Sequence, residues 1–134
     1  MTSNDRTSLE TPEVPVSWGE LVDKITILEI KSHRLESEAG RANVLTELRM
    51  LSERARPLFA AHREADALKA KLTAVNEALW DIEDNIRQAE ARKAFDADFI
   101  RLARSVYITN DERARLKRDI DIAGLGAVLG FLDP

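Results

Sequence analysis

Hydrophobic residues recur along the middle of the chain at intervals of three and four. The series comprises Val44, Leu48, Leu51, Ala55, Leu58, Ala61, Ala65, Leu68, Leu72, Val75, Leu79, Ile82, Ile86 and Ala89. Such spacing places all of its members on one face of a helix. The one irregularity coincides with Pro57, and proline removes a helical hydrogen bond and clashes with the preceding turn. We therefore predict a kink or break at Arg56-Pro57, followed by a helix from about Leu58 to Lys93.

An earlier helix is predicted from Trp18 to Ala39. Ser17 and Glu20 have the spacing of a capping box, in which both side chains bond early amide groups of the helix. Gly40 is a typical helix stop, and Asn43 is a suitable cap for the helix that follows. Apolar residues occur on both sides of this first helix, so we expect it to be covered on both faces.

Two shorter helices are predicted near the end of the chain. Asp96 can cap a helix over residues 97–107 that has Phe99, Ile100, Leu102, Ala103 and Val106 on its inward side. Asn110, inside the capping-box pattern of residues 109–112, can cap another helix that runs to Ala123 and ends at Gly124. The expected fold is all-α: a long antiparallel, coiled-coil-like hairpin between residues 18–39 and 44–93, with the two shorter helices packed back on it.

Composition agrees with one helical domain. The 134 residues are 44% hydrophobic and 33% charged, with five Gly and no Cys, which excludes disulfide frameworks and cysteine zinc sites. We expect residues 1–16 to be a disordered arm, residues 17–123 to be a single domain, and residues 124–134 to pack loosely. The first sixteen residues contain no apolar signal region, and no apolar run is long enough to span a membrane. We therefore expect a cytoplasmic protein without membrane contact.

The net charge of −4 disfavours nucleic acids as partners, because their phosphates attract cationic surfaces. The charges are unevenly distributed. Residues 77–90 carry five acids and one base, whereas residues 98–118 carry six bases and three acids. We predict that the two segments contact each other, within a subunit or across a dimer, with Arg101 and Arg104 near Glu83, Asp84 and Glu90.

Two groups of polar residues lie among apolar ones. Glu29 falls inside the apolar arc of the first helix, where a carboxylate is costly unless it is paired. It is an ion-pair partner of a base from another helix, a rim residue whose side chain reaches water, or a functional acid in a pocket between helices. A second stripe has the helical spacing of one face, and it is either a packing face with a Glu83–Arg87 ion pair or a ligand pocket. Its members are Asn76, Trp80, Glu83 and Arg87.

Acidic pairs three residues apart raise the question of a metal site. Glu20 with Asp23, and Asp81 with Asp84, resemble in outline the magnesium-binding pairs of all-α nucleotide pyrophosphohydrolases. Such pairs arise by chance in a chain that is one-third charged. We therefore predict no metal and no cofactor.

Basic residues near the end of the chain suggest an anion site. Arg101, Arg104, Arg113 and Lys117 can surround a phosphate or an anionic sugar beside the amide groups that follow Asn110. The sequence identifies no catalytic residue. The candidate ligand-binding residues are Glu29, Asn76, Trp80, Glu83, Asp84, Arg87, Arg101, Arg104 and Asn110.

Three stretches carry a family resemblance: VSWGELVDKITILEIKSHRL (16–35), VNEALWDIEDNIR (75–87) and DFIRLARSVYITNDERARLKRDI (98–120). They resemble an uncharacterised bacterial family of small helical proteins, a domain of unknown function. The resemblance covers most of residues 16–122 and implies a helical domain without an established activity. Members encoded near glycosyltransferases point any ligand toward sugar or nucleotide-sugar chemistry.

Two functions remain open. The leading prediction is a non-enzymatic scaffold or protein-interaction module that forms a homodimer, because the long apolar series and the Trp80 stripe exceed what one short chain readily covers. A further protein partner is possible. The alternative is a small enzyme or ligand-binding domain that acts on a phosphate-bearing or sugar substrate. The absence of a recognisable nucleophile favours the first function.

Overall fold

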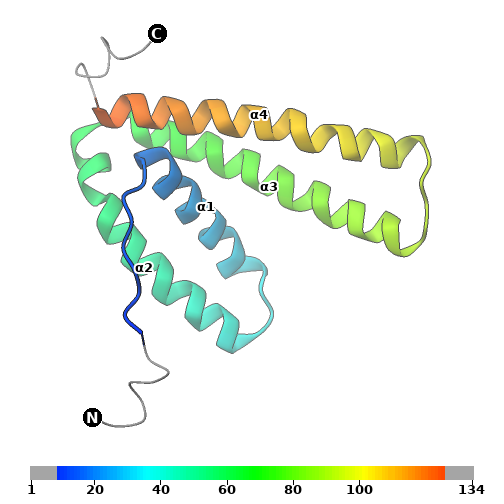
Figure 1. The fold of residues 1–134 in the computed structure, drawn as a ribbon, viewed down its shortest axis with the longest axis horizontal. Helices are drawn as coiled ribbons and strands as arrows, with labels where there is room; N and C mark the ends of the chain where they lie inside the picture. Colours follow the sequence, from blue (N-terminus) through cyan, green and yellow to red (C-terminus); the bar gives the residue numbers. More distant parts are fainter. Residues whose placement is uncertain (1–8, 126–134) are drawn as a thin grey trace.

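The computed structural model describes residues 9–125, which form four α-helices and no strand (Figure 1). The helices are α1 (Trp18–Arg34), α2 (Glu38–Ala61), α3 (Glu64–Ala91) and α4 (Ala97–Leu125). The expected all-α class is therefore confirmed for this part of the chain.

The helices form two antiparallel hairpins of unequal length. Helix α1 pairs with α2, and α3 pairs with α4 (Figure 1). The shorter pair packs against only one end of the longer pair, so the α3–α4 hairpin extends beyond it. We call residues 64–81 and 110–125 the proximal half of this hairpin, and residues 82–109, with the link between the helices, its distal half.

The link between α1 and α2 lies before Gly40, which corrects the predicted boundary. Ser17 caps α1 as expected, since its hydroxyl accepts a hydrogen bond from the amide of Glu20 at 3.1 Å. However, α1 ends at Arg34, and the hydroxyl of Ser37 accepts a hydrogen bond from the amide of Gly40 at 3.2 Å. Gly40 therefore lies in the first turn of α2, and Asn43 lies inside that helix and caps nothing. The start of α2 is therefore set by the Ser37 cap, and Gly40 does not end the preceding helix.

The second predicted boundary is also displaced, because α2 passes through Pro57 and ends at Ala61. The break falls at His62 and Arg63, five residues after the predicted break. Proline costs the helix one hydrogen bond, but burial of Ala55 and Leu58 on either side of it holds this last turn against the core. Helix α3 then ends at Ala91, two residues before the predicted end.

Helix α4 is continuous, which overturns the prediction of two C-terminal helices. Asp96 begins it as expected, by accepting a hydrogen bond from the amide of Phe99 at 3.1 Å. Thr109 and Asn110 lie inside the helix and cap nothing, and Gly124 does not stop it. One face of α4 consists of buried or partly buried residues: Phe99, Leu102, Val106, Thr109, Arg113, Leu116, Ile120 and Ala123. Successive positions in this series are three or four residues apart, without interruption. The inward series of α3, from Ala65 to Ala89, has the same intervals, so the two series face each other along the antiparallel pair.

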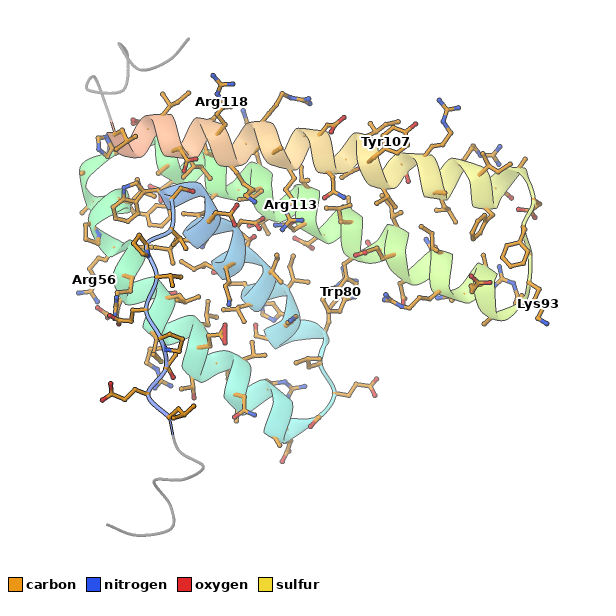
Figure 2. The ribbon with its side chains drawn as sticks, viewed as in Figure 1. Arg56, Trp80, Lys93, Tyr107, Arg113 and Arg118 are labelled. Atoms are coloured by element: carbon orange, nitrogen blue, oxygen red, sulfur yellow. The ribbon has the colours of Figure 1, made fainter. Side chains whose placement is uncertain are left out.

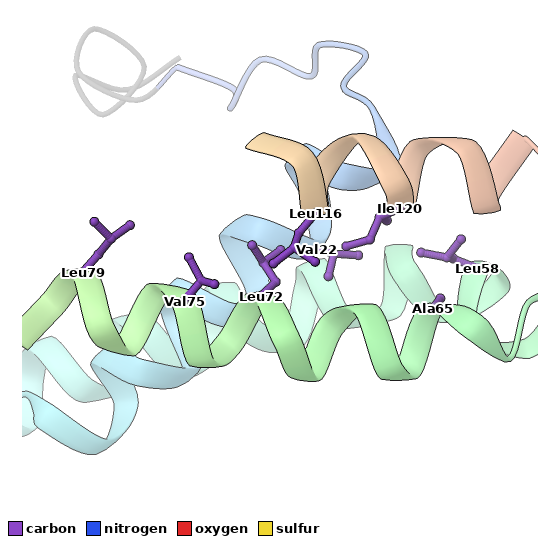
Figure 3. Packing of buried hydrophobic residues seen from close by; sticks show 8 residues of the cluster. All are labelled: Val22, Leu58, Ala65, Leu72, Val75, Leu79, Leu116 and Ile120. Atoms are coloured by element: carbon purple, nitrogen blue, oxygen red, sulfur yellow. The ribbon is translucent and has the colours of Figure 1, made fainter. Parts of the chain in front are cut away.

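The hydrophobic core lies at the junction of all four helices. Its buried members are Val22, Leu58, Ala65, Leu72, Val75, Leu79, Leu116 and Ile120 (Figure 3). Every member that belongs to α3 or α4 lies in the proximal half of the hairpin. In the distal half, Ala89 is the only buried residue.

Two glycines allow α1 to approach α4 closely. A Cβ atom on Gly19 would overlap with the backbone carbonyl of Lys117, and one on Gly124 would overlap with the indole of Trp18. The amide of Gly19 donates a hydrogen bond to the Asp121 carboxylate at 2.7 Å. The start of α1 is thus fixed to the end of α4.

The segment before α1 is extended and exposed over residues 9–16, and it passes across α2 in the view of Figure 1. One ion pair, 2.7 Å between Glu13 and Arg54, joins it to that helix. The predictions for residues 1–8 and for most of the tail, residues 126–134, lie outside the described part of the chain.

Candidate functional site

A group of polar side chains lies inside the junction of α1, α3 and α4. Among residues 9–125 the buried polar residues are Asp23, Thr26 and Asn76. Arg113 reaches them from α4, and its side chain is 28% exposed. We call these four residues the Asp23 cluster.

The hydrogen bonds of the Asp23 cluster join the three helices. Oδ1 of Asp23 accepts bonds from Asn76 Nδ2 and from Arg113 Nε, both at 2.9 Å. Oδ2 accepts a bond from Arg113 Nη2 at 2.5 Å, so the guanidinium binds the carboxylate through two nitrogens. The Thr26 hydroxyl accepts a bond from Asn76 Nδ2 at 2.8 Å and donates one to the Asp23 carbonyl at 2.7 Å.

The surroundings of Asp23 keep it ionised. Burial alone raises the pKa of a carboxyl group, because it disfavours the charged form. In Asp23, the hydrogen bonds from Arg113 and Asn76 and the charges of Arg113 and Lys117 outweigh burial, so its pKa lies below the ordinary value of 3.8. The same pairing raises the pKa of the Arg113 guanidinium. Both partners therefore remain charged at neutral pH.

Further polar groups form the exposed edge of the Asp23 cluster. Lys117 Nζ lies 2.6 Å from a Glu20 carboxylate oxygen and 4.0 Å from Oδ2 of Asp23. Arg113 Nη1 donates a bond to Asn110 Oδ1 at 3.4 Å. Glu83 also contributes to the raised pKa of Arg113 through its charge.

Chemically, the Asp23 cluster is a satisfied network. Both carboxylate oxygens of Asp23 face donors, and the amide nitrogen of Asn76 has two acceptors. Such a network fixes the helices that contribute to it in one arrangement. Among residues 9–125 no three His, Asp or Glu side chains are arranged to hold a metal ion.

The predicted ligand-binding residues do not come together in one place in the structure. Asn76 belongs to the Asp23 cluster, and Asn110 lies at its edge. Glu29 is separate from both: its Oε2 lies 3.0 Å from Nζ of Lys69, which confirms the predicted ion pair with another helix. Trp80 lies under the guanidinium of Arg34, whose carbon is 5.6 Å from the ring centroid.

The remaining predicted site residues lie on exposed faces of the distal half: Glu83, Asp84, Arg87, Arg101 and Arg104. Arg87 pairs with Asp84 at 3.4 Å rather than with Glu83, and Arg101 pairs with Asp98. The acidic and basic segments do lie side by side, as predicted, on α3 and α4. The predicted pairs of Arg101 and Arg104 with Glu83, Asp84 and Glu90 are absent among the described residues, because the charges on this half point outward and pair along one helix.

Asp23 and Arg113, the centre of the Asp23 cluster, are not among the predicted ligand-binding residues. The sequence pattern places Asp23 only in an acidic pair with Glu20, and Arg113 only in the predicted anion site. Two signals pointed to them. A first helix that is covered on both faces leaves little surface on which Asp23 can be solvated. On α4, Arg113 is the one charged residue in the inward series.

The distal half presents apolar side chains to solvent. Phe95, Ile100, Tyr107 and Ile108 are each more than half exposed. Phe95 also stacks edge-on against Phe99, with ring centroids 5.1 Å apart, beside a shallow hollow lined in part by Gln88 and Leu102. In the described part of the chain, every helix is too polar or too short to cross a lipid bilayer.

A comparison with protein families identifies the chain over nearly its whole length. Residues 12–128 match the family of unknown function DUF6165. The chain belongs to this family. The match confirms the resemblance to a domain of unknown function, and it spans both hairpins and the Asp23 cluster of this DUF6165 domain. Neither a curated protein nor a solved structure matches the chain.

Proposed function

We propose that this DUF6165 chain is a helical protein-interaction module that self-associates through the distal half of its α3–α4 hairpin. The observation that carries this proposal is the contrast in burial along that hairpin. Seven core residues of the cluster in Figure 3, all but Val22, lie on α2 or on the proximal parts of α3 and α4, whereas the distal half buries only Ala89.

A projecting pair of helices is poorly suited to stand alone. Two helices cover each other along one seam, and each needs a further partner to bury the rest of its apolar surface. In the distal half, Ile82, Ile86, Phe99 and Leu102 line the seam and stay only partly buried. Exposed apolar residues that gather in one region indicate an interaction surface.

The Asp23 cluster fits this function because it holds the proximal half of the hairpin rigidly against α1. Its bonds tie α3 and α4 to α1, so the hairpin leaves the junction in a fixed direction. The nine residues of the predicted ligand site belong instead to several separate sets of contacts. Glu29 pairs with Lys69, Trp80 lies against Arg34, and Asn76 binds Asp23, and we therefore propose the interaction module alone.

The test is the solution mass of the full chain combined with hydrogen exchange. Light scattering should give twice the 15.1 kDa chain mass at high protein concentration and approach the single-chain mass on dilution. Amide protection should rise with concentration over residues 82–109 and stay constant around Leu116 and Ile120. A single-chain mass at every concentration would contradict self-association.

A further inference from the structure

One face of α4 carries a regular exposed stripe, opposite to the face that packs on α3. It contains Ile100, Arg104, Tyr107 and Ile108 of the distal half together with Asp111 just beyond it, and we call these five residues the outer stripe. Its three large apolar members are 56%, 55% and 57% exposed. Ile100 was predicted to point inward, and its exposure adds to the apolar surface of this face. Figure 2 shows Tyr107 on the side of α4 away from α3.

The charges of the outer stripe are complementary to those of a second, antiparallel copy of the stripe. Arg104 lies three residues before Tyr107, and Asp111 lies three residues after Ile108. A two-fold axis through the midpoint of Tyr107 and Ile108 therefore places each Arg104 opposite the Asp111 of a second copy. Neither side chain forms an ion pair with another described residue.

We propose that the outer stripe is the docking surface for a second copy of this chain, with the two α4 helices antiparallel across a two-fold axis. This inference rests on the proposed function and names its surface and geometry. Each Tyr107 packs against the Ile108 of the other copy, and two Arg104–Asp111 ion pairs flank this centre. A two-fold interface of this kind uses the same patch on both subunits and closes on itself.

The residue types suit such an interface. Tyrosine and arginine are enriched where proteins bind each other, and paired charges at the edge set the orientation. A parallel arrangement would bring Arg104 against Arg104 and Asp111 against Asp111, and like charges disfavour it. Charge therefore selects the antiparallel dimer.

A second exposed apolar surface, on α2, lacks this complementarity. Leu45 and Met50 are exposed there, but several of the nearby charges already have partners within the chain. These pairs are Lys24–Glu47, Arg54–Glu13 and Arg56–Glu53. The outer stripe has unpaired charges of both signs, and we therefore assign the second copy to α4.

Charge reversal with rescue tests the assignment. Arg104→Glu and Asp111→Arg should each raise the dimer dissociation constant by about a hundredfold, because each places two like-charge contacts in the interface. The double variant restores opposite charges and should return within about threefold of the original constant. Arg49→Glu, the same charge change on exposed α2, is the control and should leave the constant unchanged.

A second measurement does not depend on the charge variants. The chain contains no cysteine, so a single Ile108→Cys substitution places one thiol per subunit beside the two-fold axis. A short bis-maleimide should join two Ile108→Cys chains efficiently, whereas Met50→Cys chains should remain uncrosslinked. Thermal melts establish that all variants remain folded.

The outcomes separate this inference from the proposed function. If the chain dimerises but neither charge reversal weakens the dimer, or if Arg49→Glu or Met50→Cys gives the effect instead, the α4 surface is wrong and self-association stands. If each reversal dissociates the dimer without rescue in the double variant, the antiparallel pairing is wrong. If the unaltered chain is a monomer throughout, both proposals fail.

Discussion

The two halves of the α3–α4 hairpin share the same helices and the same spacing of inward residues, yet they differ in what surrounds them. In the proximal half, α1 and α2 cover the hairpin, and Leu72 and Ile120 are fully buried. In the distal half, the equivalent seam positions Ile86 and Leu102 remain partly exposed. The spacing of a seam therefore determines which helices pair, but burial requires a third element over that seam.

The two halves also differ in where they tolerate polar residues. The proximal half contains Asn76 and Arg113 beside the core, and both are bonded to Asp23 of α1. The distal seam is apolar over Ile82, Ile86, Phe99 and Leu102. An inward charged or amide side chain is stable only where another helix supplies its partner, and in the described part of the chain only the proximal half has such a helix.

The largest contrast should come from neutralising one carboxylate in each half. Asp23→Asn leaves the Arg113 guanidinium without its charge partner, and we expect it to lower the free energy of unfolding by about 4 kcal/mol. Asp84→Asn removes an exposed partner of Arg87 and should change the free energy of unfolding by less than about 0.5 kcal/mol. Urea unfolding monitored by circular dichroism measures both values.

The Asp23→Asn difference should depend on pH. Because the folded pKa of Asp23 lies below 3.8, its ionised form contributes stability that is fully present above that pH and is lost as the pH falls through the folded pKa. The difference in the free energy of unfolding between the original chain and Asp23→Asn should therefore be constant from neutral pH down to about pH 5. It should become smaller in more acidic solution. A gap that widens below pH 4 would contradict the network described here.

A smaller contrast should appear when one leucine is shortened in each half. Leu72→Ala leaves a cavity in the fully buried core and should cost about 3 kcal/mol of unfolding free energy. Leu102→Ala, at the partly exposed equivalent seam, should cost about 1 kcal/mol. Equal costs at the two sites, measured in dilute solution, would show that the distal half is covered in some other way.

A small effect is also expected at Glu29, whose exposure lies between those of Asp23 and Asp84. Its side chain is 34% exposed, whereas that of Asp23 is 5% exposed, so water screens the Glu29–Lys69 pair far more than the Asp23–Arg113 pair. Glu29→Gln should therefore lower the free energy of unfolding by about 0.5 kcal/mol. A loss near that of Asp23→Asn would mean that the Glu29–Lys69 pair is as well shielded as the Asp23 cluster.

Regular spacing made much of the fold predictable. The caps at Ser17 and Asp96 are confirmed, since each depends on residues close together in sequence. The apolar series from Val44 to Ala89 is also partly or fully buried, except for Ala61, which is exposed where α2 ends. Boundaries were predicted less well. The pattern around Asn110 has the form of a cap, but the packing of Leu116 and Ile120 on one side and Leu102 on the other keeps the helix continuous.

The site was less predictable, because its partners are far apart in sequence. Asn76 was named as a candidate, but its partner Asp23 is 53 residues away and Asp23 is 90 residues from Arg113. Periodicity can show that such residues point inward. It does not show which inward polar residues meet, since that depends on how the two hairpins pack.

The bond between the Gly19 amide and the Asp121 carboxylate has a consequence for the order of folding. Ser17 caps α1 locally, but this second bond joins residues 102 positions apart. During synthesis from the N-terminus, the first turn of α1 lacks this acceptor until α4 has been made, whereas the rest of α1 can pair with α2 as soon as that helix follows it. The start of α1 is thus among the last parts of the two hairpins to acquire its native contacts, and unfolding the last turns of α4 should release it.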